Sequence, residues 1–201
     1  MKLVLLSILF FFGISFHVLA QRFDAGFVGG MTATQVDGDS HAGYNKIGPI
    51  GGIWVGCRLS SVFYSRMEIR YVQKGSYAKD PQEGSTSFYR MRLNYCEIPL
   101  FLGYRLRNGF NPLVGLSGGY LIKGKEMNEF GEFPPEDIQK FKKFEFAGLV
   151  GLEYNRSERW AFYLVYSYSF FPIRSHNSNI TYRWNRGQYN NVLELAVRYK
   201  L

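Results

Sequence analysis

Apolar and polar side chains alternate with a period of two along most of this chain, which is the pattern of β-strands with two different faces. The alternation is clearest near the C-terminus, where the two faces are formed by Leu193, Leu195, Val197 and Tyr199 and by Glu194, Ala196, Arg198 and Lys200. Eight strands are predicted from this pattern: Phe23–Val36, Ile47–Leu59, Val62–Ala78, Ser87–Leu106, Phe110–Lys123, Lys143–Asn155, Trp160–Pro172 and Gln188–Leu201.

The predicted connections alternate strictly in length. The short ones are Ser60–Ser61, Arg107–Gly109 and Arg156–Arg159. The long ones are Asp37–Lys46, Lys79–Thr86, Gly124–Lys142 and Ile173–Gly187. Outer-membrane barrels combine short periplasmic turns with longer outer loops. The sequence therefore predicts an all-β fold, a single eight-stranded antiparallel up-and-down transmembrane β-barrel with both termini in the periplasm.

An eight-stranded barrel has an interior just wide enough to be filled by side chains. The polar faces of the third and last strands carry charges that are expected to pair across the lumen: Arg66, Glu68, Arg70, Glu194 and Arg198. We expect a structural network, and the alternative is a path for protons or ions. Glycines 52, 56, 115, 119 and 151 are expected to make room for the long side chains.

Aromatic residues near the predicted strand ends are expected to form a girdle at the inner, periplasmic interface of the outer membrane: Tyr104, Tyr154, Trp160, Tyr189 and Tyr199. Pro99 lies within the fourth predicted strand, where a residue without an N–H group fits only a bulge or a strand end. The predicted periplasmic rim is basic. Its cations are Arg58, Arg105, Arg107, Arg156, Arg159 and Lys200. We expect them to contact periplasmic partners, lipid headgroups or solvent.

The N-terminus resembles a secretory signal peptide. Lys2 precedes an apolar run at Leu3–Phe12, and Val18-Leu19-Ala20 supplies a cleavage site before Gln21. The run is shorter than the roughly 20 residues of a membrane-spanning helix. We predict a signal peptide at residues 1–20 and one barrel domain at residues 21–201.

The charge and the cysteine content exclude several other classes of protein. The net charge is +8, but basic residues are dispersed among acidic and aromatic ones, which argues against a nucleic-acid partner. Cys57 and Cys96 fall on segments that are not neighbours in a meander, so we expect two unpaired thiols. The sequence contains no closely spaced His and Cys ligands for zinc, and no cofactor is predicted.

Two alternative functions stay open. The first is an outer-membrane lipid hydrolase, for which the candidate residues are His41 and His176, both in predicted loops. Asp37 and Asp39 lie near His41 but fall short of a calcium loop. The second is a soluble periplasmic carrier, in which the same meander encloses a small ligand with its apolar face, as in lipocalins.

The longest connection, Gly124–Lys142, mixes aromatic residues with Pro134 and Pro135. Acidic residues after these prolines suit a helix start, and a helical turn is expected at Gln139–Lys143. We interpret this segment as a cap over the outer barrel mouth. Partner recognition by the same segment is a hypothesis that deletion of residues 126–141 would test.

Several stretches together resemble one known family. They are Gly26–Gly30, Glu68–Gly75, Gly115–Tyr120, Gly148–Tyr154, Asn190–Leu195 and, above all, Leu93–Leu100. Their order is similar to the PorT-type outer-membrane β-barrel family of Bacteroidetes, although this chain ends in Leu201 where most outer-membrane barrels end in Phe. The resemblance implies an outer-membrane location. It also implies a non-enzymatic envelope protein, structural or accessory to a secretion or assembly complex, with outer-membrane lipid and other envelope proteins as partners.

Overall fold

The computed structural model describes residues 23–39, 43–80, 86–134, 136, 138–175 and 187–201. The predicted signal peptide lies outside this range, so cleavage near Ala20 stays a prediction. Within the described part of the chain, no helix is long and apolar enough to cross a membrane. The regular structure of these residues consists of β-strands.

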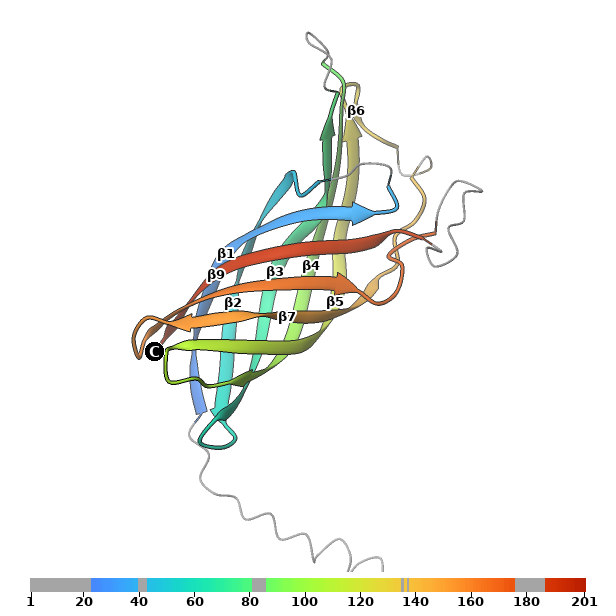
Figure 1. Ribbon diagram of the computed structural model, residues 1–201. Helices are drawn as coiled ribbons and strands as arrows, with labels where there is room; N and C mark the ends of the chain where they lie inside the picture. Colours follow the sequence, from blue (N-terminus) through green and yellow to red (C-terminus); the bar gives the residue numbers. More distant parts are fainter. Residues whose placement is uncertain (1–22, 40–42, 81–85, 135, 137, 176–186) are drawn as a thin grey trace, which may run out of the picture.

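Eight long antiparallel strands close into a ring (Figure 1). They are β1 (Phe23–Asp37), β2 (Lys46–Arg58), β3 (Phe63–Lys79), β4 (Phe88–Tyr104), β5 (Phe110–Asn128), β7 (Phe144–Asn155), β8 (Trp160–Ser169) and β9 (Tyr189–Lys200). The two-residue β6 (Gly131–Glu132) pairs only with the end of β5. β9 pairs with β1 and closes the ring, which confirms the prediction of an up-and-down barrel closed by the C-terminal strand.

The strands are unequal in length. β3, β4 and β5 contain 17, 17 and 19 residues and extend past their neighbours at the end opposite the C-terminus (Figure 1). β5 continues to Asn128, five residues beyond the predicted end at Lys123, through a bulge opposite the Asn94–Tyr95 step of β4. A bulge adds one residue without ending the ladder. This explains why the alternation alone placed the end of β5 too early.

The segment after β6 folds back over the outer end of the barrel. Phe141 packs against a buried apolar cluster there, and the N–H of Lys142 donates to the carbonyl of Ile173 at 2.7 Å. The expectation of a cap is thus confirmed for Phe141. The expected helical turn at Gln139–Lys143 is wrong, because these residues form no regular structure and the N–H of Lys142 is engaged by Ile173.

The outside of the wall is apolar. Many apolar side chains in the middle of strands are exposed, and the exposed fractions of Leu116 and Leu164 are 63% and 53%. A soluble protein does not present a continuous apolar wall to water, whereas a transmembrane barrel needs one for lipid. The soluble carrier, whose apolar face would point inward, is therefore wrong.

Aromatic pairs join neighbouring strands at the end with the short turns. The ring centroids are 5.2 Å apart for Phe63–Tyr104, 4.7 Å for Phe110–Tyr154 and 4.8 Å for Trp160–Tyr199. These pairs agree with the predicted girdle. Tyr189 does not belong to it, because Tyr189 pairs with Asp37 at the outer end and stacks on Tyr168 at 6.0 Å. β9 begins at the outer end, so a residue at its start cannot lie near the inner interface.

The interior is layered. Along β4, the inward-facing residues are Phe101 in one apolar cluster, Glu97 in a charged layer, and Tyr95 and Leu93 in a second apolar cluster. Pro99 also faces inward in the middle of β4, so its expected position at a bulge or strand end is wrong. The β3–β4 ladder is interrupted opposite Pro99 without a change of register, which is how a strand accommodates a residue that cannot donate.

The five predicted glycines lie where neighbouring atoms come close to the backbone. A Cβ at any of glycines 52, 56, 115, 119 and 151 would lie within 4 Å of neighbouring atoms. At Gly52 the distance to the Cα of Arg70 would be 2.7 Å. The close approach of β2 and β3 at this level therefore depends on glycine.

Candidate functional site

The candidate site is the charged interior, which begins on two strands. Arg66, Glu68 and Arg70 alternate along β3, and Glu194 and Arg198 alternate along β9. The period of two turns all five side chains toward the lumen while their neighbours face lipid. Four of the five are at most 1% exposed, and Arg198 lies nearer the mouth with a side chain that is 13% exposed.

Arg70 is the centre of the network. Its Nη2 lies 2.6 Å from Oε2 of Glu97 and 2.8 Å from Oε1 of Glu194, and its Nη1 lies 3.4 Å from Oε2 of Glu68. The hydroxyl of Tyr163 lies within 3.4 Å of both Arg70 and Glu68. One guanidinium thus joins β3 to β4 and to β9.

Lys74 extends the network toward the outer end. Its Nζ lies 2.8 Å from Oε1 of Glu97 and 3.1 Å from Oε2 of Glu145 on β7. The hydroxyl of Ser169 donates to the other oxygen of Glu145. These residues complete the charged layer but are not in the predicted set. The alternation of apolar and polar residues in their strands was sufficient to predict that Lys74 and Glu145 face inward.

Nearer the periplasmic end, Glu153 on β7 forms ion pairs with two arginines. It binds Arg66 and Arg198, and its contact with Nη2 of Arg198 is 2.9 Å. Tyr64 donates to the same carboxylate at 2.9 Å. Nε of Arg66 lies 2.9 Å from Oε1 of Glu68, so this group is joined to the Arg70 cluster. The structure therefore links all five predicted residues, with Glu153 as the connection that the prediction missed.

The linked residues are four cations and five carboxylates: Arg66, Arg70, Lys74 and Arg198 with Glu68, Glu97, Glu145, Glu153 and Glu194. They span the lumen from wall to wall. Removing one partner of a buried pair leaves an uncompensated charge and costs about 3–5 kcal/mol, so the network strongly constrains the strands that it joins. Its chemistry is ion pairing between groups that are already engaged.

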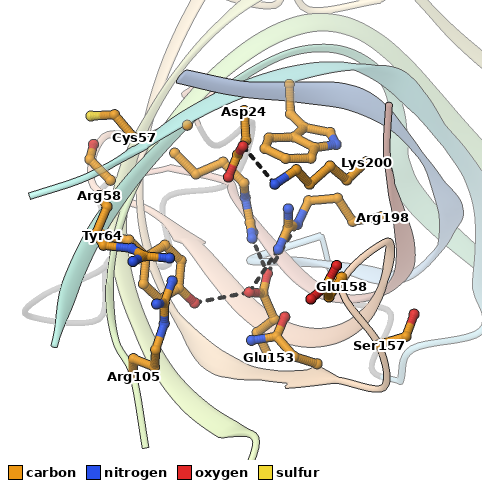
Figure 2. Close-up of a pocket in the computed structure, with 15 residues that line it drawn as sticks. Asp24, Cys57, Arg58, Tyr64, Arg105, Glu153, Ser157, Glu158, Arg198 and Lys200 are labelled. Atoms are coloured by element: carbon orange, nitrogen blue, oxygen red, sulfur yellow. Dashed lines mark hydrogen bonds and ion pairs between the residues drawn. The ribbon is translucent and has the colours of Figure 1, made fainter. Parts of the chain in front are cut away.

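A cavity of about 570 Å³ opens at the end with the short turns (Figure 2). By the rule of short periplasmic turns, this end faces the periplasm. Its cationic lining consists of Arg58, Arg66, Arg105, Arg198 and Lys200. Its acidic lining consists of Asp24, Glu153 and Glu158. The ion pair of Glu153 with Arg66 and Arg198 separates this cavity from the deeper charged layer.

The predicted basic rim divides into two groups. Arg58, Arg105 and Lys200 line the cavity. Arg107, Arg156 and Arg159 are exposed on the turns and do not line it. The two groups therefore offer different surfaces to the periplasm, one concave and one convex.

Asp37, another sequence candidate, lies at the outer end of the barrel. His41 and His176 fall outside the described residues. The carboxylate of Asp37 accepts hydrogen bonds from Gln35 at 2.8 Å and from Asn191 at 3.2 Å, and among described residues no three His, Cys, Asp or Glu side chains cluster as metal ligands. Tyr44 donates to Oδ1 of Asn191 at 2.6 Å, and burial raises the pKa of Tyr44.

The two cysteines lie on different strands, β2 and β4, and both are free thiols. Cys96 is exposed on the outer wall and Cys57 is partly buried near the periplasmic mouth. Strand β3 separates β2 from β4 in the ring. This order agrees with the expectation that they do not pair.

Three solved outer-membrane structures are similar to this chain. The Ail protein of Yersinia pestis, solved in complex with the heparin analogue sucrose octasulfate, has 12% identity and a TM-score of 0.50, over 90% of this chain and 99% of that one. Neisserial surface protein A has 13% identity and a TM-score of 0.48 over 89% and 97%. OprG of Pseudomonas aeruginosa has 13% identity and a TM-score of 0.37 over 89% and 94%. At these identities, the likeness to Ail supports the fold alone.

The family comparison covers most of the sequence. The family described as outer membrane protein beta-barrel domain matches residues 16–175, and no curated protein matches the chain. The match includes seven of the eight wall strands, β1 to β5, β7 and β8. With the closed ring and the apolar wall, it shows that this chain is an integral protein of the cell outer membrane and belongs to the outer membrane protein beta-barrel domain family.

Proposed function

We propose that this protein is a non-enzymatic envelope barrel that works as an accessory of a secretion or assembly complex through the two ends of the barrel. The observation that carries the proposal is the closed interior. Arg66 bridges β3 to Glu153 on β7, and Arg70 bridges β3 to Glu194 on β9. Side chains that bind each other across the lumen leave the ends of the barrel as the surfaces for contact with other molecules.

Each end presents a distinct surface. At the periplasmic end, Arg107, Arg156 and Arg159 project from the turns. At the outer end, the β5–β6 hairpin carries Phe130, which is 90% exposed. Large exposed aromatic residues and arginines are the side chains most enriched at the centres of protein interfaces. The resemblance to PorT-type barrels, one of which belongs to a secretion and gliding system, supports the same role.

Photo-crosslinking in intact cells tests this proposal. A photoreactive amino acid would replace Arg107, Arg156 or Phe130, with a lipid-facing control at Leu164. We expect specific protein adducts from at least one end and none from Leu164. Reversal of charge at Arg107, Arg156 and Arg159 should remove the adducts of the periplasmic end. If neither end forms a protein adduct that differs from the control, the accessory role is wrong.

The outer hairpin can be tested separately. Deletion of 126–141 would remove Glu126, which binds Arg174 at 2.6 Å, and would also remove the Phe141 cap. A shorter deletion of residues 129–138 keeps both and removes the projecting tip. With the photoreactive residue at Lys125, which lies on the same hairpin and remains in the shortened chain, loss of the outer adducts with normal barrel assembly would assign recognition to the tip, whereas unchanged adducts would exclude it.

A further inference from the structure

The periplasmic cavity has one strongly cationic side. Arg58 is paired with Tyr64 across β2 and β3, and Tyr64 is paired with Gly103 across β3 and β4, so Arg58, Tyr64 and Arg105 follow one another around the wall. Figure 2 shows the three side chains on the same side of the mouth, and the guanidinium carbon of Arg105 lies 6.0 Å from the centre of the Tyr64 ring. Two guanidinium groups are therefore presented from the end of β2 and from the residue after β4, on either side of β3.

The acidic groups of the cavity do not neutralise this side. Asp24 binds Lys200 at 2.6 Å, and Glu153 is shared by Arg66 and Arg198. Glu158 lies across the mouth from Arg58 and Arg105 in Figure 2. Among the described residues, neither Arg58 nor Arg105 forms an ion pair. The cavity has five cations and three carboxylates, and the two unpaired cations lie on either side of Tyr64.

The floor of the cavity supplies a second, independent observation. Arg66 is 1% exposed and lines the cavity, and its Nη2 has no hydrogen-bond acceptor among the described groups. Its guanidinium carbon lies 4.7 Å from the centre of the Phe101 ring, while Glu153 and Glu68 bind its other nitrogens. A buried donor without an acceptor is costly unless something else accepts from it.

We propose that the periplasmic mouth is a binding site for a water-soluble oxyanion, a carboxylate or phosphate group, held by Arg58 and Arg105 with Nη2 of Arg66 as a donor at the floor. The planar guanidinium fork matches both oxyanions and binds them with charge-assisted hydrogen bonds. The ligand is water-soluble because these side chains face the barrel axis and not the lipid. A cavity of about 570 Å³ has room for the molecule that carries the oxyanion.

The proposal deepens the proposed function, since it rests on the periplasmic end being a working surface. Titration calorimetry of the folded mature barrel in a zwitterionic detergent tests it, with inorganic phosphate and succinate as the two probes. We expect at least one probe to bind the wild type, and the R58A/R105A double variant to bind it at least tenfold more weakly. Comparison of the two probes shows whether phosphate or carboxylate is the preferred group.

The control is Arg107→Ala, which removes one positive charge from the turn that also carries Arg105 but lies outside the cavity. Its affinity should stay within twofold of the wild type. Arg58 and Arg105 are exposed, so the double variant should fold, and the mobility of the unboiled protein checks this. If neither probe binds, or if R107A and R58A/R105A lose affinity equally, the oxyanion site is wrong. The crosslinking test is not affected by that result, because its positions lie outside the cavity.

Discussion

Arg70 and Glu194 tie β3 to β9 across the lumen, with 2.8 Å between Nη2 and Oε1 and both side chains fully buried. Among the described residues, Arg70 is the cation that binds Glu194, whereas Glu97 also binds Lys74. Loss of Arg70 therefore leaves Glu194 as the least compensated carboxylate in the interior.

We predict that Arg70→Met lowers the free energy of unfolding by about 3–5 kcal/mol, because a buried charge loses its partner. Addition of Glu194→Gln should restore part of this loss. Urea titration of the barrel in lipid vesicles, followed by electrophoretic mobility, measures both effects. Arg107→Met, a change at an exposed turn, is the control. An R70M variant as stable as this control would contradict the account of the network.

The close approach of β2 and β3 predicts a second effect. Gly52→Val should destabilise the barrel by about 1–3 kcal/mol through overpacking, since a Cβ there would meet Ile69 and Arg70. Gly51 is the matched control, because a Cβ at Gly51 would meet no atom within 4 Å. Equal stabilities of G52V and G51V in the same titration would show that the interior has more space than the structure indicates.

The apolar wall predicts an effect that depends on depth in the membrane. Leu164→Arg, in the middle of β8, should cost about 2–4 kcal/mol, whereas Leu106→Arg, just beyond the periplasmic end of β4, should cost about 0–1 kcal/mol. Unfolding in vesicles compares the two variants. Equal costs would argue against a lipid-facing position for Leu164.

The outer cap depends on Arg174, which binds Glu126 at 2.6 Å and lies 4.5 Å above the Phe141 ring. We predict that Arg174→Ala loosens the cap and speeds proteinase K cleavage between residues 129 and 142 in intact cells. Lys140→Ala, which removes a nearby exposed charge, should leave the rate unchanged. Barrel mobility on gels should be normal in both variants, so that the change can be assigned to the cap.

The sequence predicts the fold well because period-two alternation is a local property of each strand. The parity of β3 and β9 places Arg66, Arg70 and Glu194 inside without knowledge of any neighbour. The identity of the partners is not local. Arg66 meets Glu153, 87 residues away, through the register of eight strands, and a single bulge in β5 changes parity past Leu121.

To predict at which end of the barrel a residue lies, one must also know the direction of its strand. Tyr189 shows this, since its place at a strand end did not say which end. The periplasmic cavity forms where three turns meet the ends of β1 and β9, which composition does not reveal. The basic residues in those turns indicated a cationic rim. The sequence did not show that Arg58 and Arg105 line a cavity whereas Arg107 does not.

This chain is a closed barrel in the outer membrane. Electrophoretic mobility of the protein extracted from the outer-membrane fraction, with and without boiling, tests it most directly. We expect the unboiled protein to resist the detergent and to migrate differently from the boiled, unfolded chain. Recovery of the protein in the soluble periplasmic fraction, with the same mobility before and after boiling, would contradict it.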